Sequence, residues 1–342
     1  MRNRLRSAAL LLAFTLVGAG LLSCDQGGPS PPMTADEARR QIIESASGLQ
    51  EAAATFDQTP LARLSGAMMG SGADGKKVSP WGEALISGLG AVLDTTGGSF
   101  DYDASTGAYV WNPDTQAWRQ ERPADSLILR FPESPDAPSN NATFTLSRYE
   151  TRSVPVAGST EEVPTKVGAS LSVDGTEAFA LSLKDVSFTP LLGIPQSFSL
   201  DVTANPLAFT TSLEPDQNGT FQYEDRFRND GQPVTATTAT VDLSPESAES
   251  SENTLGRVEG TTQVGQDLAI EYTADIAPSA LEDASADELD DRVDVDVRLQ
   301  GDRVATLRYD GAAEQVVVEY ADGTTEPLSD LLREIGVAEG AS

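Results

Sequence analysis

The chain of 342 residues contains no histidine, a single cysteine and only four lysines. The absence of histidine excludes Ser-His-Asp and Cys-His catalysis, the HExxH zinc motif and histidine-rich metal sites. The single cysteine, Cys24, excludes an intramolecular disulfide. The scarcity of lysine leaves no basic patch that would neutralise phosphates, so we do not expect nucleic acid as a partner.

Acidic residues dominate the charge of the chain. There are 53 Asp and Glu residues against 23 Lys and Arg residues, which gives a formal net charge of −30. The acids are spread along the whole sequence, which is typical of proteins that work in high salt. There the screening length falls to about 3 Å at molar ionic strength and removes the self-repulsion. The alternative is an acidic surface that binds a cation or a basic partner.

The first 23 residues have the form of a signal peptide. Three arginines precede an apolar run over residues 8–22, which is short beside the roughly 20 apolar residues of a stable membrane span. The run ends in Leu21-Leu22-Ser23-Cys24, which resembles the lipobox of bacterial lipoproteins. The alternatives are an ordinary secretory signal and a short membrane span with an incidental cysteine.

The lipobox resemblance implies cleavage before Cys24 and attachment of a lipid to its thiol. Two or three acyl chains would give durable anchoring, so the membrane is the expected partner. Residues 24–33 are predicted to be the lipidated cysteine and a flexible Gly/Pro/Ser linker. The mature chain would have 20 basic against 53 acidic residues, a net charge near −33. We expect a location in the cell envelope, facing the periplasm or the exterior, with the outer membrane preferred over the inner.

Residues 34–96 are predicted to form a helical segment. Thr34 begins a capping box of the S/T-x-x-E type, and an apolar stripe extends from there to Phe56. Thr59-Pro60 and Ser79-Pro80 each place an N-cap residue before a proline at the first helical position. The sequence therefore predicts three helices, over residues 34–56, from residue 60 onward, and over residues 81–93.

Residues 97–342 are predicted to form an antiparallel β domain with a short C-terminal helix over residues 326–335. Apolar and polar residues alternate over 127–131, 143–147, 179–183 and 293–299, as expected for strands with one wet face. Pairs such as Asp174-Gly175, Asp230-Gly231 and Asp322-Gly323 are hairpin signals. Twelve to fifteen strands fit between residues 99 and 320. The segments 171–181 and 297–307 align weakly, which leaves a duplicated pair of β units open beside a single unit.

These elements predict the α+β class, mainly antiparallel β, with N-terminal helices packed on a large twisted sheet or half-barrel. In architecture alone, this layout is similar to the half-barrel lipid carriers of bacterial envelopes, in which a curved sheet cups an apolar ligand under helices.

Three motifs are candidate sites. Tyr109, Trp111 and Trp118 flank a turn and would form either a platform that stacks on a ligand or a cross-strand cluster that stabilises a hairpin. Acids at 283–291, among them Asp287, Asp290 and Asp291, would form either a calcium site or a solvated loop, and the loop is preferred because EF-hand spacing is missing. Residues 70–76 match a phosphate loop by letter only, because the Ser or Thr that should follow is a lysine.

The sequence predicts no cofactor, no metal site and no catalytic residue, and Cys24 is the one residue with an assigned role. The preferred function is that of a non-enzymatic structural or interaction lipoprotein of the cell envelope, with an envelope protein as its partner. Two alternatives stay open. One is a carrier of a lipid or another apolar ligand, and the other is a carboxylate-based hydrolase of envelope glycans.

Overall fold

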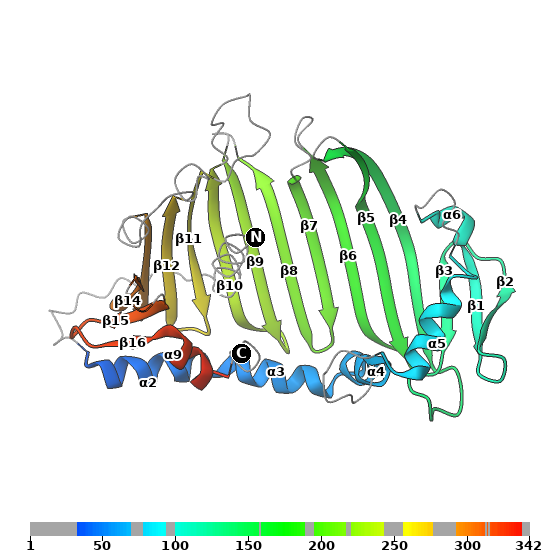
Figure 1. The fold of residues 1–342 in the computed structure, drawn as a ribbon, viewed down its shortest axis with the longest axis horizontal. Helices are drawn as coiled ribbons and strands as arrows, with labels where there is room; N and C mark the ends of the chain where they lie inside the picture. The colour runs from blue at the N-terminus through cyan, green and yellow to red at the C-terminus, as the bar shows by residue number, and fades with distance from the viewer. Residues whose placement is uncertain are drawn as a thin grey trace. The chain divides into compact units, whose positions relative to one another are not determined.

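The structure is a computed structural model that describes residues 33–69, 78–93, 100–156, 159–188, 195–216, 220–242, 256–275, 292–311, 313 and 315–336. Most of these residues lie in antiparallel strands, and helices are concentrated near the N-terminus (Figure 1). The predicted α+β class is therefore confirmed.

The predicted helical stretches are present, but the one expected over residues 34–56 is divided at Ala46 into two helices, the third ends at Leu89 instead of residue 93, and a short helix beyond residue 100 was not predicted. The helices are α2 (Ala35–Ser45), α3 (Ser47–Gln58), α4 (Pro60–Met69), α5 (Pro80–Leu89), α6 (Tyr102–Ser105) and α9 (Leu328–Glu334). The predicted capping residues act as expected: the Ser79 hydroxyl accepts from the Gly82 N–H at 3.0 Å, and the Thr59 hydroxyl accepts from the Ala62 N–H at 3.1 Å. Among the described helices, none is long and apolar enough to cross a membrane.

The strands follow the helices in chain order. They are β1 (Gly107–Asn112), β2 (Ala117–Arg122), β3 (Leu127–Phe131), β4 (Ala142–Val156), β5 (Ser159–Val173), β6 (Thr176–Phe188), β7 (Pro195–Ala204), β8 (Leu207–Pro215), β9 (Phe221–Asn229), β10 (Gln232–Asp242), β11 (Arg257–Val264), β12 (Leu268–Asp275), β13 (Val293–Leu299), β14 (Asp302–Asp310), β15 (Gln315–Tyr320) and β16 (Thr325–Pro327).

Nearly all neighbouring strands are joined as antiparallel hairpins, as the turn signals predicted. Asp174-Gly175 joins β5 to β6 and Asp230-Gly231 joins β9 to β10, with positive φ at all four residues. One pair departs from the expectation of antiparallel pairing. Strand β1 pairs with β3 in parallel, since β2 turns back on the far side of β1 and occupies that edge.

The chain divides into two compact units. The first, called unit 1, contains residues 1–53 and 211–342; the second, unit 2, contains residues 54–210. Both units combine helices with strands. The aligned segments 171–181 and 297–307 are both hairpins and belong to different units.

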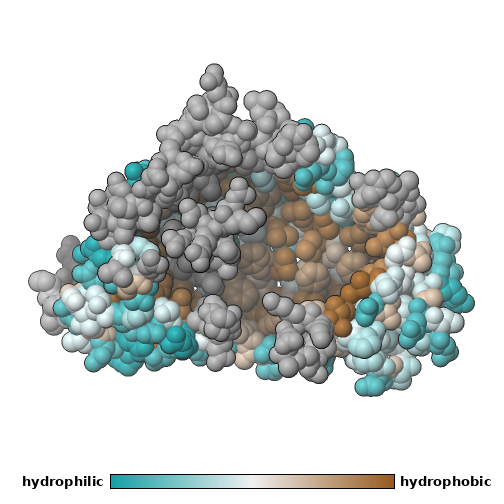
Figure 2. Space-filling view, in the orientation of Figure 1, coloured by the Kyte–Doolittle hydropathy of each residue, from teal (hydrophilic) through white to brown (hydrophobic). Residues whose placement is uncertain are grey.

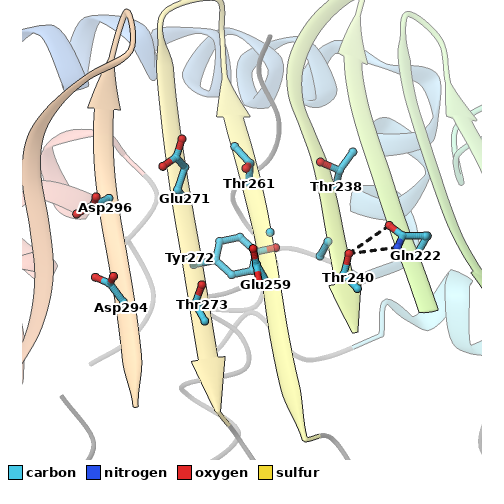
Figure 3. A pocket seen from close by; sticks show the side chains of 12 residues that line it. Gln222, Thr238, Thr240, Glu259, Thr261, Glu271, Tyr272, Thr273, Asp294 and Asp296 are labelled. Atoms are coloured by element: carbon cyan, nitrogen blue, oxygen red, sulfur yellow. Dashed lines mark hydrogen bonds between the residues drawn. The ribbon is translucent and has the colours of Figure 1, made fainter. Parts of the chain in front are cut away.

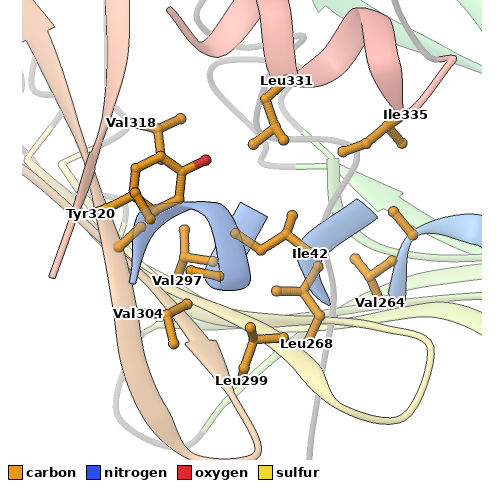
Figure 4. Packing of buried hydrophobic residues seen from close by; sticks show 14 residues of the cluster. Ile42, Val264, Leu268, Val297, Leu299, Val304, Val318, Tyr320, Leu331 and Ile335 are labelled. Atoms are coloured by element: carbon orange, nitrogen blue, oxygen red, sulfur yellow. The ribbon is translucent and has the colours of Figure 1, made fainter. Parts of the chain in front are cut away.

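In unit 1, helices α2 and α9 pack over strands β11–β15 (Figure 4). Ile42 of α2 is 4% exposed and packs with Val297, Leu268 and Leu331. Polar contacts also fix this helix to the C-terminal part of the chain. The Ala35 N–H donates to Asp322 at 2.7 Å, and Arg39 pairs with Glu326 at 3.0 Å and with Glu334 at 2.6 Å.

In unit 2, helices α4 and α5 pack against strands β1–β6. Leu64 and Leu85 contribute one side of this core, and Trp111, Leu129 and Leu171 belong to the other. The predicted apolar positions of β3 are all buried, in the alternating pattern that the sequence indicated. Long-range packing of this kind explains why short helices of only ten residues are stable here.

Candidate ligand-binding surfaces

One face of unit 2 carries an apolar surface across strands β5–β7. Cross-strand pairing places Val167, Leu183 and Leu200 in one row and Ala169, Leu181 and Val202 in the next. Side chains directly opposite one another point to the same face of a sheet. The other face of these strands is polar, and there Lys184 pairs with Asp201 at 3.3 Å. The apolar rows therefore form one continuous face, which we call the apolar face (β5–β7).

The helices of unit 2 do not bury this face completely. Leu171 and Val173 lie within the core formed with α4 and α5 and are 4% and 6% exposed. Leu181, Leu183 and Leu200 remain half-buried, and so does almost the whole of β7. Figure 2 shows a hollow lined by apolar residues over these strands.

A polar groove of about 370 Å³ lies on unit 1, over strands β9–β13 (Figure 3). Its lining includes Glu259, Glu271, Asp294 and Asp296, with threonines between them. Most of these carboxylates have arginine partners: Glu271 pairs with Arg298 at 2.6 Å, Asp296 with the same arginine at 3.3 Å and with Arg303 at 3.5 Å, and Glu259 with Arg257 at 3.4 Å. The groove therefore has few uncompensated charges with which to bind a cation.

A glycine in β11 makes room for a tyrosine of the neighbouring strand. A Cβ at Gly260 would lie 2.7 Å from both the Thr238 carbonyl oxygen and the Tyr272 hydroxyl. The missing side chain therefore lets the Tyr272 ring lie across strand β11 toward β10. Burial raises the pKa of Tyr272 to about 12, so the phenol stays protonated.

The opposite face of unit 1 is apolar but contains a cluster of polar residues, which we call the inner polar cluster (Tyr223, Asp225, Thr237, Thr262 and Tyr272). Asp225 is 6% exposed, Thr237 4% and Thr262 0%. Pairing places Asp225 opposite Thr237 and Thr237 opposite Thr262. Burial raises the pKa of the Asp225 carboxyl, and a hydrogen bond from Thr237 partly offsets this. A carboxyl on an apolar face is the most unusual feature of this unit.

The predicted aromatic residues are packed within unit 2. Trp111 is 2% exposed and meets Trp118 edge to face, with ring centroids 5.4 Å apart. The Trp118 indole N–H donates to the Leu85 carbonyl at 3.2 Å, which ties this hairpin to α5. Tyr109 lies beside Gly107 and is half-buried. Trp111 therefore offers no exposed ring surface on which a ligand could stack.

The other sequence-predicted residues lie outside the described part of the chain. These are Cys24 with the signal peptide and most of the linker, the acids Asp287, Asp290 and Asp291, and the segment 70–76. Within the described residues, no group of three or more acidic or cysteine side chains is placed to hold a metal ion.

Asp225 is not among the residues predicted from the sequence, although the alternation of its strand indicates its burial. Phe221, Tyr223 and Phe227 occupy alternate positions of one strand, and Asp225 shares their phase. An acid in phase with three aromatic residues indicates a carboxyl on the buried face.

A search of protein-family models, of curated proteins and of solved structures finds no match to this chain.

Proposed function

We propose that this chain is a lipid-anchored, non-enzymatic protein of the cell envelope that binds a long apolar molecule, such as the acyl chain of a lipid. The observation that supports this most directly is the apolar face (β5–β7), where Leu181, Leu183 and Leu200 remain half-buried. Figure 2 shows an apolar hollow over these strands. A continuous apolar surface that stays partly open to water is unfavourable and is typical of a binding site.

The chemistry of this face favours an acyl chain over a polar ligand. Leucine, valine and alanine side chains make up its two central rows. Such side chains offer dispersion contacts and exclude water but provide no hydrogen-bonding group. A flexible hydrocarbon chain needs only such contacts, and the lipobox-like segment that ends at Cys24 would hold the protein beside a membrane, where acyl chains are abundant.

The acids of the polar groove do not favour the hydrolase alternative. A carboxylate pair that hydrolyses glycosides needs one protonated acid facing one ionised acid across a substrate cleft. Glu271 and Asp296 instead share Arg298. We therefore keep the protein in the non-enzymatic class.

Extraction of the purified protein tests the proposal. The protein would be isolated in high salt, extracted with organic solvent and compared by mass spectrometry with a mock preparation. A stoichiometric acyl-chain compound is the expected result. An extract without such a compound, from protein shown to be folded by circular dichroism, would refute acyl-chain binding and leave the alternative of a protein partner.

The anchor is tested separately by replacing its cysteine. The Cys24→Ala variant is expected to lose incorporation of a labelled fatty acid and to leave the membrane fraction after salt and carbonate washes. A matched control is Ser23→Ala, which keeps a small residue before the cysteine. If Cys24→Ala remained membrane-bound through those washes, the lipid anchor would be wrong.

A further inference from the structure

A buried carboxyl normally pairs with a basic side chain or accepts several hydrogen bonds. Asp225 is 6% exposed, yet its one described hydrogen-bond partner is the Thr237 hydroxyl. Arg226 and Arg228 of the same strand are at alternate positions and face the other side, where Arg226 pairs with Glu224 at 3.1 Å. The described residues of β9–β13 place no lysine or arginine on the inner face.

The neighbours of Asp225 add an unsatisfied polar atom. Thr262 is fully buried, and its hydroxyl oxygen has no hydrogen-bond partner of ordinary geometry among the described residues. It lies near the Tyr272 hydroxyl and lowers the pKa of that phenol, although the geometry falls short of a full hydrogen bond. Thr262 stands opposite Thr237, on the same face as Asp225. Two polar side chains therefore share one buried area and lack sufficient partners.

Two tyrosines border the same area. Tyr223 and Tyr272 both lie close enough to Asp225 for its negative charge to raise their pKa values. Aromatic faces attract cations, and this attraction strengthens when the site is desolvated. Val258, Ile270 and Val295 pack beside the tyrosines and make the surroundings apolar.

These features together define the missing partner by its chemistry. An isolated carboxylate in an apolar environment is costly, and a positive charge that donates hydrogen bonds offsets the cost. A hard metal ion needs more oxygen ligands than one carboxylate and its neighbouring hydroxyls supply. An alkylammonium group fits better, since its N–H groups match the carboxylate and the Thr262 oxygen while its alkyl part matches the apolar neighbours.

We propose that the inner polar cluster of unit 1 binds the ammonium group of an amine-bearing amphiphile, with Asp225 as its counter-ion, Thr262 as a hydrogen-bond acceptor and Tyr223 and Tyr272 against the cation. This inference goes beyond the proposed function, which concerns the apolar face of unit 2.

The test compares two soluble probes that differ only in the polar group, n-hexylammonium chloride and 1-hexanol. Calorimetry in 1 M NaCl would measure the binding of each probe to the full protein, purified as the cell produces it. The high salt screens non-specific attraction of the cation to this acidic chain. The variants are Asp225→Asn and, as a matched control, Glu224→Gln, which removes a carboxylate on the outer face of the same strand.

The wild-type protein is expected to bind hexylammonium at least about tenfold more tightly than hexanol, since a hydrogen bond between charged groups increases the binding affinity by about that factor. Asp225→Asn should abolish the preference and leave hexanol binding unchanged, and Glu224→Gln should retain the preference. Equal affinity of the wild-type protein for the two probes would overturn the inference. So would an unchanged preference in Asp225→Asn, or an equal loss in Glu224→Gln. A failure of acyl-chain extraction would refute the proposed function without affecting this comparison.

Discussion

The double substitution Leu183→Ser with Leu200→Ser should weaken acyl-chain binding by the apolar face of unit 2. The two leucines are directly opposite each other on β6 and β7, and both are half-buried. Full burial of a leucine contributes about 1.5–3 kcal/mol, so covering the part that remains exposed contributes about 0.5–1 kcal/mol for each side chain. Losing both contributions amounts to about 1–2 kcal/mol, or roughly a fivefold to thirtyfold weaker affinity.

A fluorescent C16 acyl probe titrated into the protein in high salt would measure this affinity. The matched control is Ser182→Ala with Ser199→Ala, which changes the opposite face of the same two strands, where Ser182 stands opposite Asp201 and Ser199 opposite Lys184. The control variant should bind like the wild-type protein. Urea unfolding of both variants should show that they remain folded. If the leucine variant bound the probe with wild-type affinity, or if the control variant lost as much, the apolar face would not be the binding surface.

Three further predictions concern unit 1. Ile42→Ala should lower the free energy of unfolding by about 2–5 kcal/mol in urea denaturation, because this 4% exposed side chain holds α2 in the core; an effect below about 1 kcal/mol would contradict that packing. Gly260→Ala should cost about 1–3 kcal/mol and change the near-ultraviolet dichroism of Tyr272, because the new Cβ would meet the phenol. The comparison is Gly48→Ala, where a Cβ would meet no atom closer than 4.0 Å; a Gly260→Ala spectrum equal to that of the wild-type protein would argue against the close approach. Hydrogen bonds hold the pKa of Asp322 below its ordinary value of 3.8, so the carboxylate stabilises the fold above that pH, and this stabilisation is lost as the pH falls through the lowered pKa. Asp322→Asn should therefore remove that part of the acid sensitivity of unfolding. Identical profiles of unfolding free energy against pH for the variant and the wild-type protein would show that this cap of α2 is unimportant.

The two proposals address different surfaces and can fail independently. The apolar face of unit 2 supports a ligand without hydrogen-bonding groups, and the inner polar cluster of unit 1 supports a ligand with a positive charge. An amphiphile that carries an amine on an acyl chain has both kinds of group. Such a compound, if recovered in the extraction experiment, would therefore be a direct candidate for titration against the Asp225→Asn variant.

Local chemistry in the sequence determined most of the secondary structure. Thr59 and Ser79 cap helices because their hydroxyls accept from free N–H groups three residues later, which needs no distant partner. Asp174-Gly175 closes a hairpin because both residues adopt positive φ. The alternation over Val293–Leu299 predicted which side chains of β13 would be buried. The absence of histidine by itself excluded several classes of catalytic and metal site, because no other side chain replaces an imidazole in them.

Only the tertiary structure decided the pairing between distant segments. Helix α2 packs against strands from the other end of the chain because Arg39 and Ile42 meet partners near residues 297–334, and no local pattern specifies that contact. The parallel pairing of β1 with β3 likewise depends on which edge β2 occupies. Burial of Asp225, with its consequences for ligand choice, arises from cross-strand register over several strands. Register depends on contacts among all of those strands together, and so a carboxyl that is one acid among 53 in the sequence becomes a distinct site in the fold.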